Sequence, residues 1–267
     1  MPRVQNDTTV RQWLDAQRVA RVLVVSPHLD DAVLSLAEFL RCVSARARVL
    51  TVFSESDPQT GLDWAQQGGF QDAAEEHAAR RLEDMRALQH LGCAYQHAGL
   101  RSGQLTATVL EQQLPGWLAA GSTPLSELLV LLPAGCGGEQ PIGALERLKH
   151  RLLRKPFGSM AHPEHLLVRN LFWKALATAG VRLGFYAELP YAWRQTDTNI
   201  RNALQTLTQG PLHHTAIPPD VERKQVAAEL YRSQVERILG HTPRYRQQVL
   251  GRPESVFLVA PVSHGTP

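Results

Sequence analysis

The chain has 267 residues, of which 43% are hydrophobic and 20% are charged, and its formal net charge is +3. This composition is ordinary for a soluble globular protein with one sizeable core, and so small a net charge gives no reason to expect nucleic-acid binding. No segment approaches the roughly 18 consecutive apolar residues of a membrane span, and the first residues lack the apolar core of a signal peptide. We therefore expect a cytoplasmic protein without stable membrane insertion.

Predicted helices and strands alternate along the chain. Residues 1–20 are expected to form a helix against the body. Beyond it, apolar runs predict strands at 22–25, 49–53, 94–98, 128–132, 183–186 and 256–259, and helical periodicity predicts helices at 33–42, 72–91, 106–119, 165–179 and 221–239. This alternation predicts a Rossmann-like, three-layer α/β/α fold with a mostly parallel sheet and right-handed crossovers. Because the sequence contains neither a repeat nor a low-complexity linker, we expect a single domain over 1–267.

The first chemically informative segment is SPHLDD at residues 26–31, directly after the first predicted strand. Parallel α/β sheets bind ligands just beyond the carboxyl ends of their strands, and Pro27 ends this strand because it has no N–H to donate. The helix that follows places Asp30 and Asp31 near a helix N-terminus, which favours negative charge. His28 and Asp31 fit half of a zinc site, although an acidic pair at this place can also be a simple helix N-cap.

A second histidine cluster, HPEH at residues 162–165, precedes the helix predicted at 165–179. Two histidines three residues apart at the start of a helix lie on one face and can point at one metal ion. Spacing alone does not distinguish them from surface histidines or hydrogen-bonded core histidines. Together the two segments offer His, Asp and His with one coordination position left open, which is the composition of a catalytic zinc site.

These motifs, PHLDD followed by AVLS and the distant HPEH, resemble the PIG-L/LmbE family of zinc-dependent N-acetylglucosamine deacetylases. The chain is also similar to that family in the pattern RxxExxxAxxxLG at 80–92, in YAELPYA at 186–192, and in Lys224 with YRSQ at 231–234. The resemblance covers about 21–239 and implies an LmbE-like fold and an N-deacetylase activity.

The resemblance implies that His28, Asp31 and His165 bind a Zn²⁺ ion, although another divalent transition metal can occupy the same ligand set. Asp30 would then be the general base that takes a proton from the attacking water and returns it to the leaving amine.

Three further residues receive roles from the resemblance. His162 would support the oxyanion, and Glu164, where the family usually has aspartate, would orient His162. Arg80 would bind polar groups of the substrate; the alternative is an ion pair with Glu83 or Glu76 on the same helix.

Residues 139–161 form an insertion relative to the related branch of the family, and 145–155 within it predict a basic helix. The insertion is either a substrate-selecting element at the site or a solvated surface helix. His213 and His214 lie in a loop bounded by glycine and proline, and either line the pocket or form an ordinary loop pair.

Three cysteines, Cys42, Cys93 and Cys136, are odd in number and lack CxxC spacing, so no disulfide framework is expected. Cys136 lies in a glycine-rich loop and is an alternative nucleophile.

We therefore expect a metal-dependent amidohydrolase that removes the acetyl group from an N-acetylglucosamine-type amino sugar or its conjugate. The partner would be a small molecule, such as a natural-product, thiol-cofactor or glycolipid precursor; an oligomer is compatible with the sequence. One alternative is a hydrolase of another acyl amide on a glycosylated natural product. The other is a non-catalytic sugar-binding member of the fold, against which the presence of all three metal ligands and the base argues.

Overall fold

The structure is a computed structural model that describes residues 3–56, 62–119, 123–137 and 161–260. The predicted insertion at 139–161 therefore lies outside the described residues, except for its last position.

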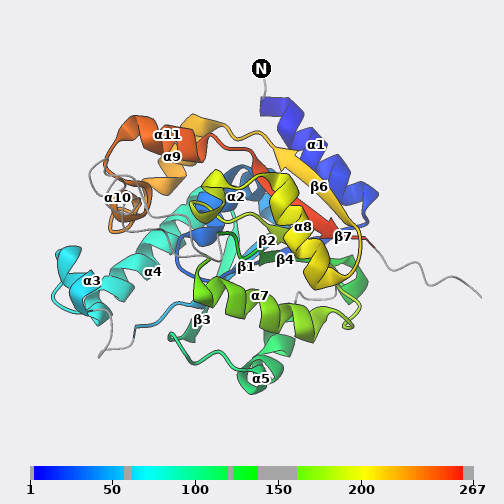
Figure 1. Cartoon of the computed structure of the whole chain (residues 1–267), viewed down its shortest axis with the longest axis horizontal. Coiled ribbons are helices and arrows are strands. Elements are labelled where there is room, and N and C mark those ends of the chain that lie inside the picture. The colour runs from blue at the N-terminus through cyan, green and yellow to red at the C-terminus, as the bar shows by residue number, and fades with distance from the viewer. Residues whose placement is uncertain (1–2, 57–61, 120–122, 138–160, 261–267) are drawn as a thin grey trace, which may run out of the picture.

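The described strands form one seven-stranded sheet in the order β3-β2-β1-β4-β5-β7-β6 (Figure 1). The strands are β1 (Arg21–Ser26), β2 (Ala47–Phe53), β3 (Ala94–Leu100), β4 (Leu128–Pro133), β5 (Arg182–Tyr186), β6 (Leu212–Ile217) and β7 (Glu254–Val259). The first five are parallel, whereas β7 is antiparallel to both of its neighbours. The mostly parallel three-layer fold is thus confirmed, with an antiparallel pair at one edge.

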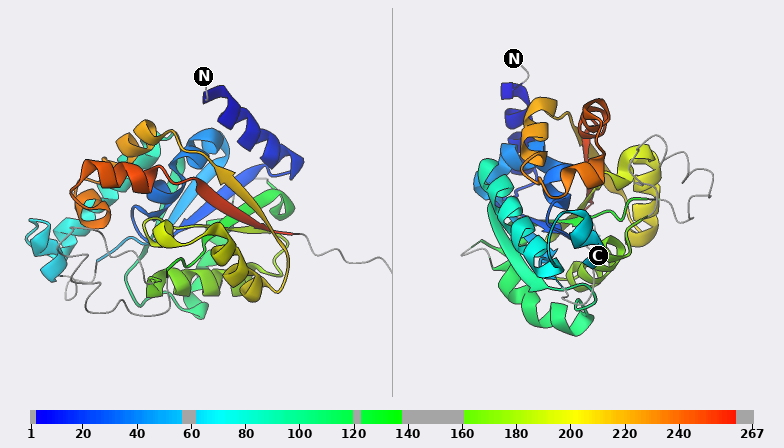
Figure 2. Two further views of the ribbon diagram at one scale, coloured as in Figure 1. Left: turned by 45° about the horizontal axis from the view of Figure 1, so that its top comes forward. Right: turned by 90° about the vertical axis from the view of Figure 1, so that its left-hand side faces the viewer.

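The helices cover both faces of the sheet (Figure 2). They are α1 (Arg3–Ala16), α2 (Asp31–Val43), α3 (Leu62–Gln67), α4 (Ala73–His90), α5 (Ala107–Leu118), α7 (Pro163–Leu176), α8 (Asp197–Thr208), α9 (Val221–Ala228), α10 (Val235–Leu239) and α11 (Pro243–Leu250). None of the described helices is long and apolar enough to cross a membrane.

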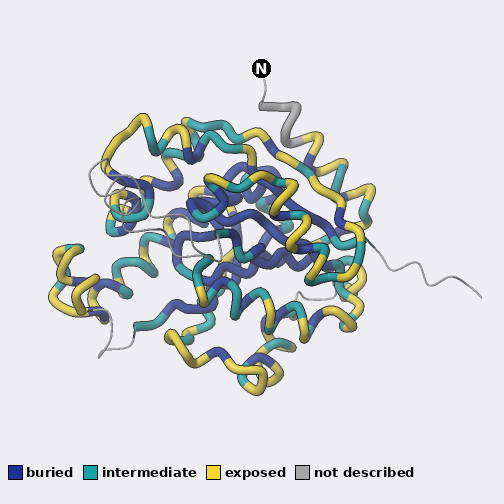
Figure 3. Tube along the Cα trace, in the orientation of Figure 1, coloured by how far each residue is buried: buried dark blue, intermediate teal, exposed yellow. Residues whose placement is uncertain are grey.

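The sheet divides the core into two clusters, because successive strand side chains point to opposite faces. In β1, Val22 and Val24 pack with α1, α2 and α4, whereas Leu23 and Val25 pack with α5, α7 and α8. Since both faces of β1 are covered, the strand reads as a continuous apolar run, and the central strands are the most deeply buried part of the chain (Figure 3).

Three local predictions differ from the structure. His213 and His214 lie in strand β6, so the loop predicted there is wrong; this edge strand is largely exposed and lacks a marked apolar pattern. The helix predicted at 221–239 is interrupted: α9 ends at Ala228 and α10 begins at Val235, and between them buried Tyr231 donates its hydroxyl to Asp84 Oδ1 at 2.6 Å. The helix α8 was not predicted from the sequence, although Thr196 caps it by accepting a hydrogen bond from Asn199 N–H.

Candidate active site

The turn between β1 and α2 places a histidine and two aspartates at the carboxyl end of the sheet. Ser26 holds this turn, since its hydroxyl donates to His28 O at 2.8 Å and accepts from Ala32 N–H at 3.1 Å. Asp30 has an unusual backbone conformation, with φ of 158° and ψ of −32°. Strained backbone of this kind is found where the surrounding structure holds a functional group in place.

Three atoms of the predicted ligand residues form a nearly equilateral triangle. Asp31 Oδ2 lies 3.1 Å from His28 Nδ1 and 3.1 Å from His165 Nε2, and the two nitrogens are 3.2 Å apart. Ligand atoms about 2.0–2.2 Å from a tetrahedral zinc ion are about 3.3–3.6 Å apart. The separations are therefore close to those of a metal site, and they bring together two histidines that are 137 positions apart in the sequence.

The outer nitrogens of both histidines contact carboxylates. His28 Nε2 lies 2.7 Å from Glu164 Oε2, and His165 Nδ1 lies 3.2 Å from Glu188 Oε1. A neutral ring that donates its outer N–H to a carboxylate presents a lone pair on its inner nitrogen, an arrangement typical of histidines that bind metals. The donor set thus directs two imidazole lone pairs and one carboxylate oxygen at the same point.

The electrostatics of the triangle favour a cation. Burial lowers the pKa of an imidazole, but Asp31 and Glu188 outweigh it and raise the pKa of His165 to about 10. Burial also opposes ionisation of Asp31, but His165 and His28 hold the pKa of its carboxyl well below its usual range. Carboxylates that stabilise a proton at this place would equally stabilise a metal ion, so the residues fit the predicted metal.

His162 is adjacent to the triangle, with its ring centroid 4.9 Å from that of His28 and 5.1 Å from that of His165. The ligand atoms of these three histidines lie within 4.8 Å of one another, so His162 is a possible fourth ligand by distance alone. However, His162 Nδ1 accepts Glu164 N–H at 3.3 Å, and burial together with the two neighbouring rings lowers the pKa of His162 to about 4. A neutral ring that accepts at Nδ1 carries its proton on Nε2, which suits a hydrogen-bond donor better than a ligand.

Asp30 is buried beside the triangle and contacts Arg80 of α4, whose Nη2 lies 3.5 Å from Asp30 Oδ2. Burial raises the pKa of Asp30 to about 7; Asp31 adds to this effect and Arg80 opposes it. The alternative partners of Arg80 are engaged elsewhere, since Glu83 accepts hydrogen bonds from Ser233 and Glu76 accepts one from Gln234. The charged partner of Arg80 is therefore Asp30, and the buried Nε of Arg80 has no hydrogen-bond partner among the described residues.

The structure places the carboxylate of Glu164 on His28, whereas the resemblance implied that it orients His162. The glutamate side chain is one methylene longer than the aspartate usual in the family, and from the first turn of α7 it reaches the ring across the site.

The sequence predicts Glu188 as a structural neighbour of the site without a direct role, and the structure shows what it contacts. Its carboxylate is buried after β5 and accepts the N–H groups of Ala134, Gly135 and Cys136 at 2.8–3.2 Å, besides contacting His165. The segment YAELPYA at 186–192 marked the region, but only the fold brings Glu188 to the loop after β4. Tyr191 from the same segment packs edge-on against His165, with ring centroids 4.8 Å apart.

Two other candidate residues, Cys136 and His214, are not part of the metal-ligand triangle. Cys136 is buried, and burial together with Glu188 raises the pKa of its thiol well above the usual range, so it is no activated nucleophile. His214 stacks on Phe257 with ring centroids 4.7 Å apart, in a strand separated from β1 by β4, β5 and β7.

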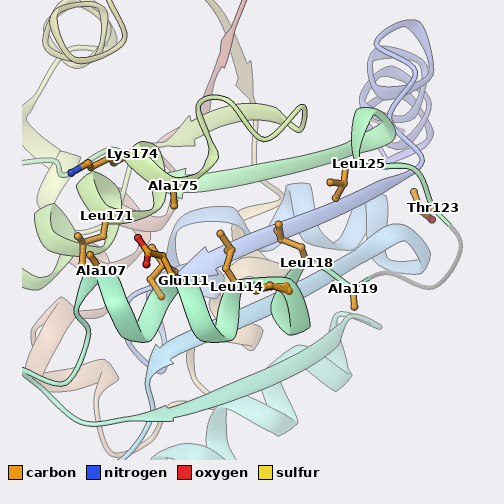
Figure 4. Close-up of a pocket in the computed structure, with 12 residues that line it drawn as sticks. Ala107, Glu111, Leu114, Leu118, Ala119, Thr123, Leu125, Leu171, Lys174 and Ala175 are labelled. Carbon is orange, nitrogen blue, oxygen red and sulfur yellow. The ribbon is translucent and has the colours of Figure 1, made fainter.

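An apolar pocket of about 680 Å³ lies between α5 and α7 (Figure 4). Its lining includes Leu114, Leu118 and Leu171, together with the charged residues Glu111 and Lys174. The α7 residues that line it belong to the C-terminal half of that helix, whereas the histidines are at its beginning. None of the predicted site residues lines this pocket.

Comparisons with known proteins bear on the sequence and the fold of this chain. No family model matches the sequence. The chain is 28% identical over 221 residues to 2′-N-acetylparomamine deacetylase of Streptomyces fradiae, a match that covers 74% of this chain. The same match covers 66% of the Streptomyces fradiae protein, so this chain spans just under two thirds of the length of that relative.

Solved deacetylases share the fold. The zinc-inhibited form of teicoplanin deacetylase Orf2 has a TM-score of 0.61 at 20% identity, covering 90% of this chain and 98% of that one. The A40926 pseudoaglycone deacetylase Dbv21 has a TM-score of 0.62 at 22% identity, covering 90% and 97%. The chain therefore shares the fold of these solved deacetylases, and one curated relative in sequence is a deacetylase by name.

Proposed function

We propose that this protein is a zinc-dependent amidohydrolase that removes the N-acetyl group from an N-acetylglucosamine-type amino sugar or its conjugate. The observation that carries the proposal is the triangle of His28 Nδ1, Asp31 Oδ2 and His165 Nε2, with each histidine backed by a carboxylate. The deacetylase names of the sequence relative and of the structural neighbours support an amide of an amino sugar as the substrate.

His28, Asp31 and His165 would hold the metal, which supplies a Lewis acid that lowers the pKa of water to about 7 and polarises a carbonyl group. Asp30 would take one proton from the attacking water and transfer it to the leaving nitrogen. Water is thereby added across the amide, giving acetate and a free amine. A base whose pKa is near 7 suits both proton transfers at neutral pH.

His162 and Arg80 would act on the substrate oxygens. The Nε2–H of His162 would donate to the oxyanion that develops on the acetyl carbonyl, where one positioned donor is worth about 3 kcal/mol. The buried Nε of Arg80 would donate to a polar group of the sugar or its acetamide.

The test is release of acetate by the zinc-loaded protein from a panel of N-acetylglucosaminides, N-acetylated aminoglycoside precursors and acylated glycopeptides, followed by mass spectrometry. We expect acetate and the matching free amine, with turnover lost after chelation and restored by Zn²⁺. Release of a different acyl group from the glycopeptides, without acetate release, would favour the alternative hydrolase. Binding of a sugar conjugate without any turnover would favour the non-catalytic member of the fold.

A further inference from the structure

The helix α2, which begins at the metal-ligand candidate Asp31, is broken after its first turn. Leu36 has φ of −132° and ψ of 24°, values outside the helical range, and the helix resumes beyond it. The piece before the break is about one turn long, and a single turn has no stability of its own. The position of Asp31 therefore depends on whatever holds both sides of the break.

A buried ion pair occupies the break. Glu254, at the start of β7, accepts the N–H groups of Glu38 and Phe39 at 3.0 and 2.8 Å. Lys224 of α9 donates from Nζ to Glu254 Oε1 at 2.7 Å and to Ser35 O at 3.3 Å. The two charged side chains are 1% and 0% exposed.

The signs of the charges match the two helix ends that the break creates. The C-terminal end of the first turn carries partial negative charge and meets the ammonium group, and the N-terminal end of the second piece carries partial positive charge and meets the carboxylate. A buried ion pair costs much desolvation and adds little stability unless its remaining hydrogen bonds are satisfied. Here those bonds all go to backbone groups that the break would otherwise leave unpaired.

Other contacts hold the same first turn. Ala32 N–H binds Ser26 Oγ on the side of β1, and Leu189 N–H binds Ser35 Oγ at 3.0 Å on the side of the segment that carries Glu188. The ion pair differs from these contacts because it fixes the angle between the first turn and the rest of α2.

We infer that Lys224 and Glu254 are positioning residues for the metal site, which hold the first turn of α2 so that Asp31 meets His28 and His165. The inference rests on the proposed function, since it concerns the same metal ion. It extends that function to a pair of charges that touch neither metal nor substrate.

The test compares Zn²⁺ affinity, measured by competition with a chromophoric chelator, in the wild-type full chain and in Lys224→Met. Methionine keeps most of the length of the side chain and removes the ammonium group. We expect Zn²⁺ to bind about tenfold or more weakly, as for other residues that orient metal ligands from outside the coordination sphere. The visible absorption of the Co²⁺-loaded variant should also change, because it reports the geometry of the ligands.

The matched control is Leu204→Ala, a cavity variant at a buried residue of α8, a helix that packs mainly on β6 and β7. It should lower the melting temperature while keeping wild-type Zn²⁺ affinity and Co²⁺ spectrum. Should Lys224→Met fail to fold, Glu254→Gln provides the same comparison, since it removes the charge and keeps the size.

Wild-type affinity and spectrum in a folded, destabilised ion-pair variant would overturn the inference and leave the proposed function intact. Failure of the wild-type protein itself to bind Zn²⁺ would instead overturn the proposed function and the inference with it.

Discussion

At the scale of single residues, the site depends on which atom of each side chain faces the centre. The carboxylates of Glu164 and Glu188 contact the outer nitrogens of His28 and His165, so the inner nitrogens of both rings face Asp31. The backbone N–H of Glu164 donates to Nδ1 of His162, so the neutral His162 ring has its own donor at Nε2. In the proposed mechanism these three chemically identical side chains would have two different roles, which their hydrogen-bond partners decide.

Asp30→Asn tests the separation of the two aspartates. The amide cannot accept a proton, so turnover should fall by about 10²–10⁴-fold while bound zinc remains, because Asp31 is unchanged. Turnover and zinc content are measured on the same preparation. His165→Ala is the control and should lose both; wild-type turnover in Asp30→Asn would refute the assignment of the base.

Cys136→Ser tests the alternative nucleophile. Because the raised pKa keeps the thiol protonated below and around neutral pH, the native protein should react slowly with iodoacetamide at pH 8 and rapidly once unfolded. The serine variant should keep turnover close to wild-type. Loss of activity on alkylation of Cys136 in the native protein would contradict this prediction.

At the scale of elements, the loop after β4 fits against α7 because it contains a glycine. Gly135 has φ of +72°, and a Cβ atom there would lie 2.6 Å from Leu166 Cδ2 and 2.8 Å from Arg169 Nη1. The same loop donates its N–H groups to Glu188, which contacts His165. A side chain at Gly135 would therefore displace the ends of the Leu166 and Arg169 side chains, or the loop itself, next to the proposed metal site.

Gly135→Ala should lower the free energy of unfolding and weaken zinc binding. Gly99→Ala is a matched control, because Gly99 also has φ of +72° but has open space where its Cβ would lie among the described residues. Both variants lose the conformational freedom of glycine, so the difference between them, about 1–3 kcal/mol in urea unfolding, measures the steric clash. Equal losses in the two variants would show that the loop or the ends of Leu166 and Arg169 can move without cost.

At the scale of the whole molecule, the site joins elements from both halves of the chain, so metal binding should stabilise the fold. His28 and Asp31 come from the β1–α2 turn and His165 from α7, and the unfolded chain lacks this arrangement.

Zinc at 100 times its dissociation constant should add about 2.7 kcal/mol to the free energy of unfolding and raise the melting temperature. Calorimetry with and without a chelator measures the change. His165→Ala should show no such increase, and an unchanged melting temperature in the wild-type protein would argue against a metal in this triangle.

By itself, the sequence determined the layered α/β fold and brought the two motifs together as one site. The reason is local: a strand buried on both faces must be a continuous apolar run, as at 22–25, and a turn after such a strand exposes its side chains at one edge of the sheet.

Only the tertiary structure decided which strands and side chains contact one another. Whether β7 runs antiparallel, whether Glu164 meets His28 or His162, and what Lys224 and Glu254 hold together are questions of contact between residues far apart in the chain. The periodicity of apolar residues predicts which side chains are buried, and their spacing predicts which of them lie on the same face of a helix or strand. Neither predicts which distant group forms hydrogen bonds with a buried polar side chain, because that depends on how the elements pack.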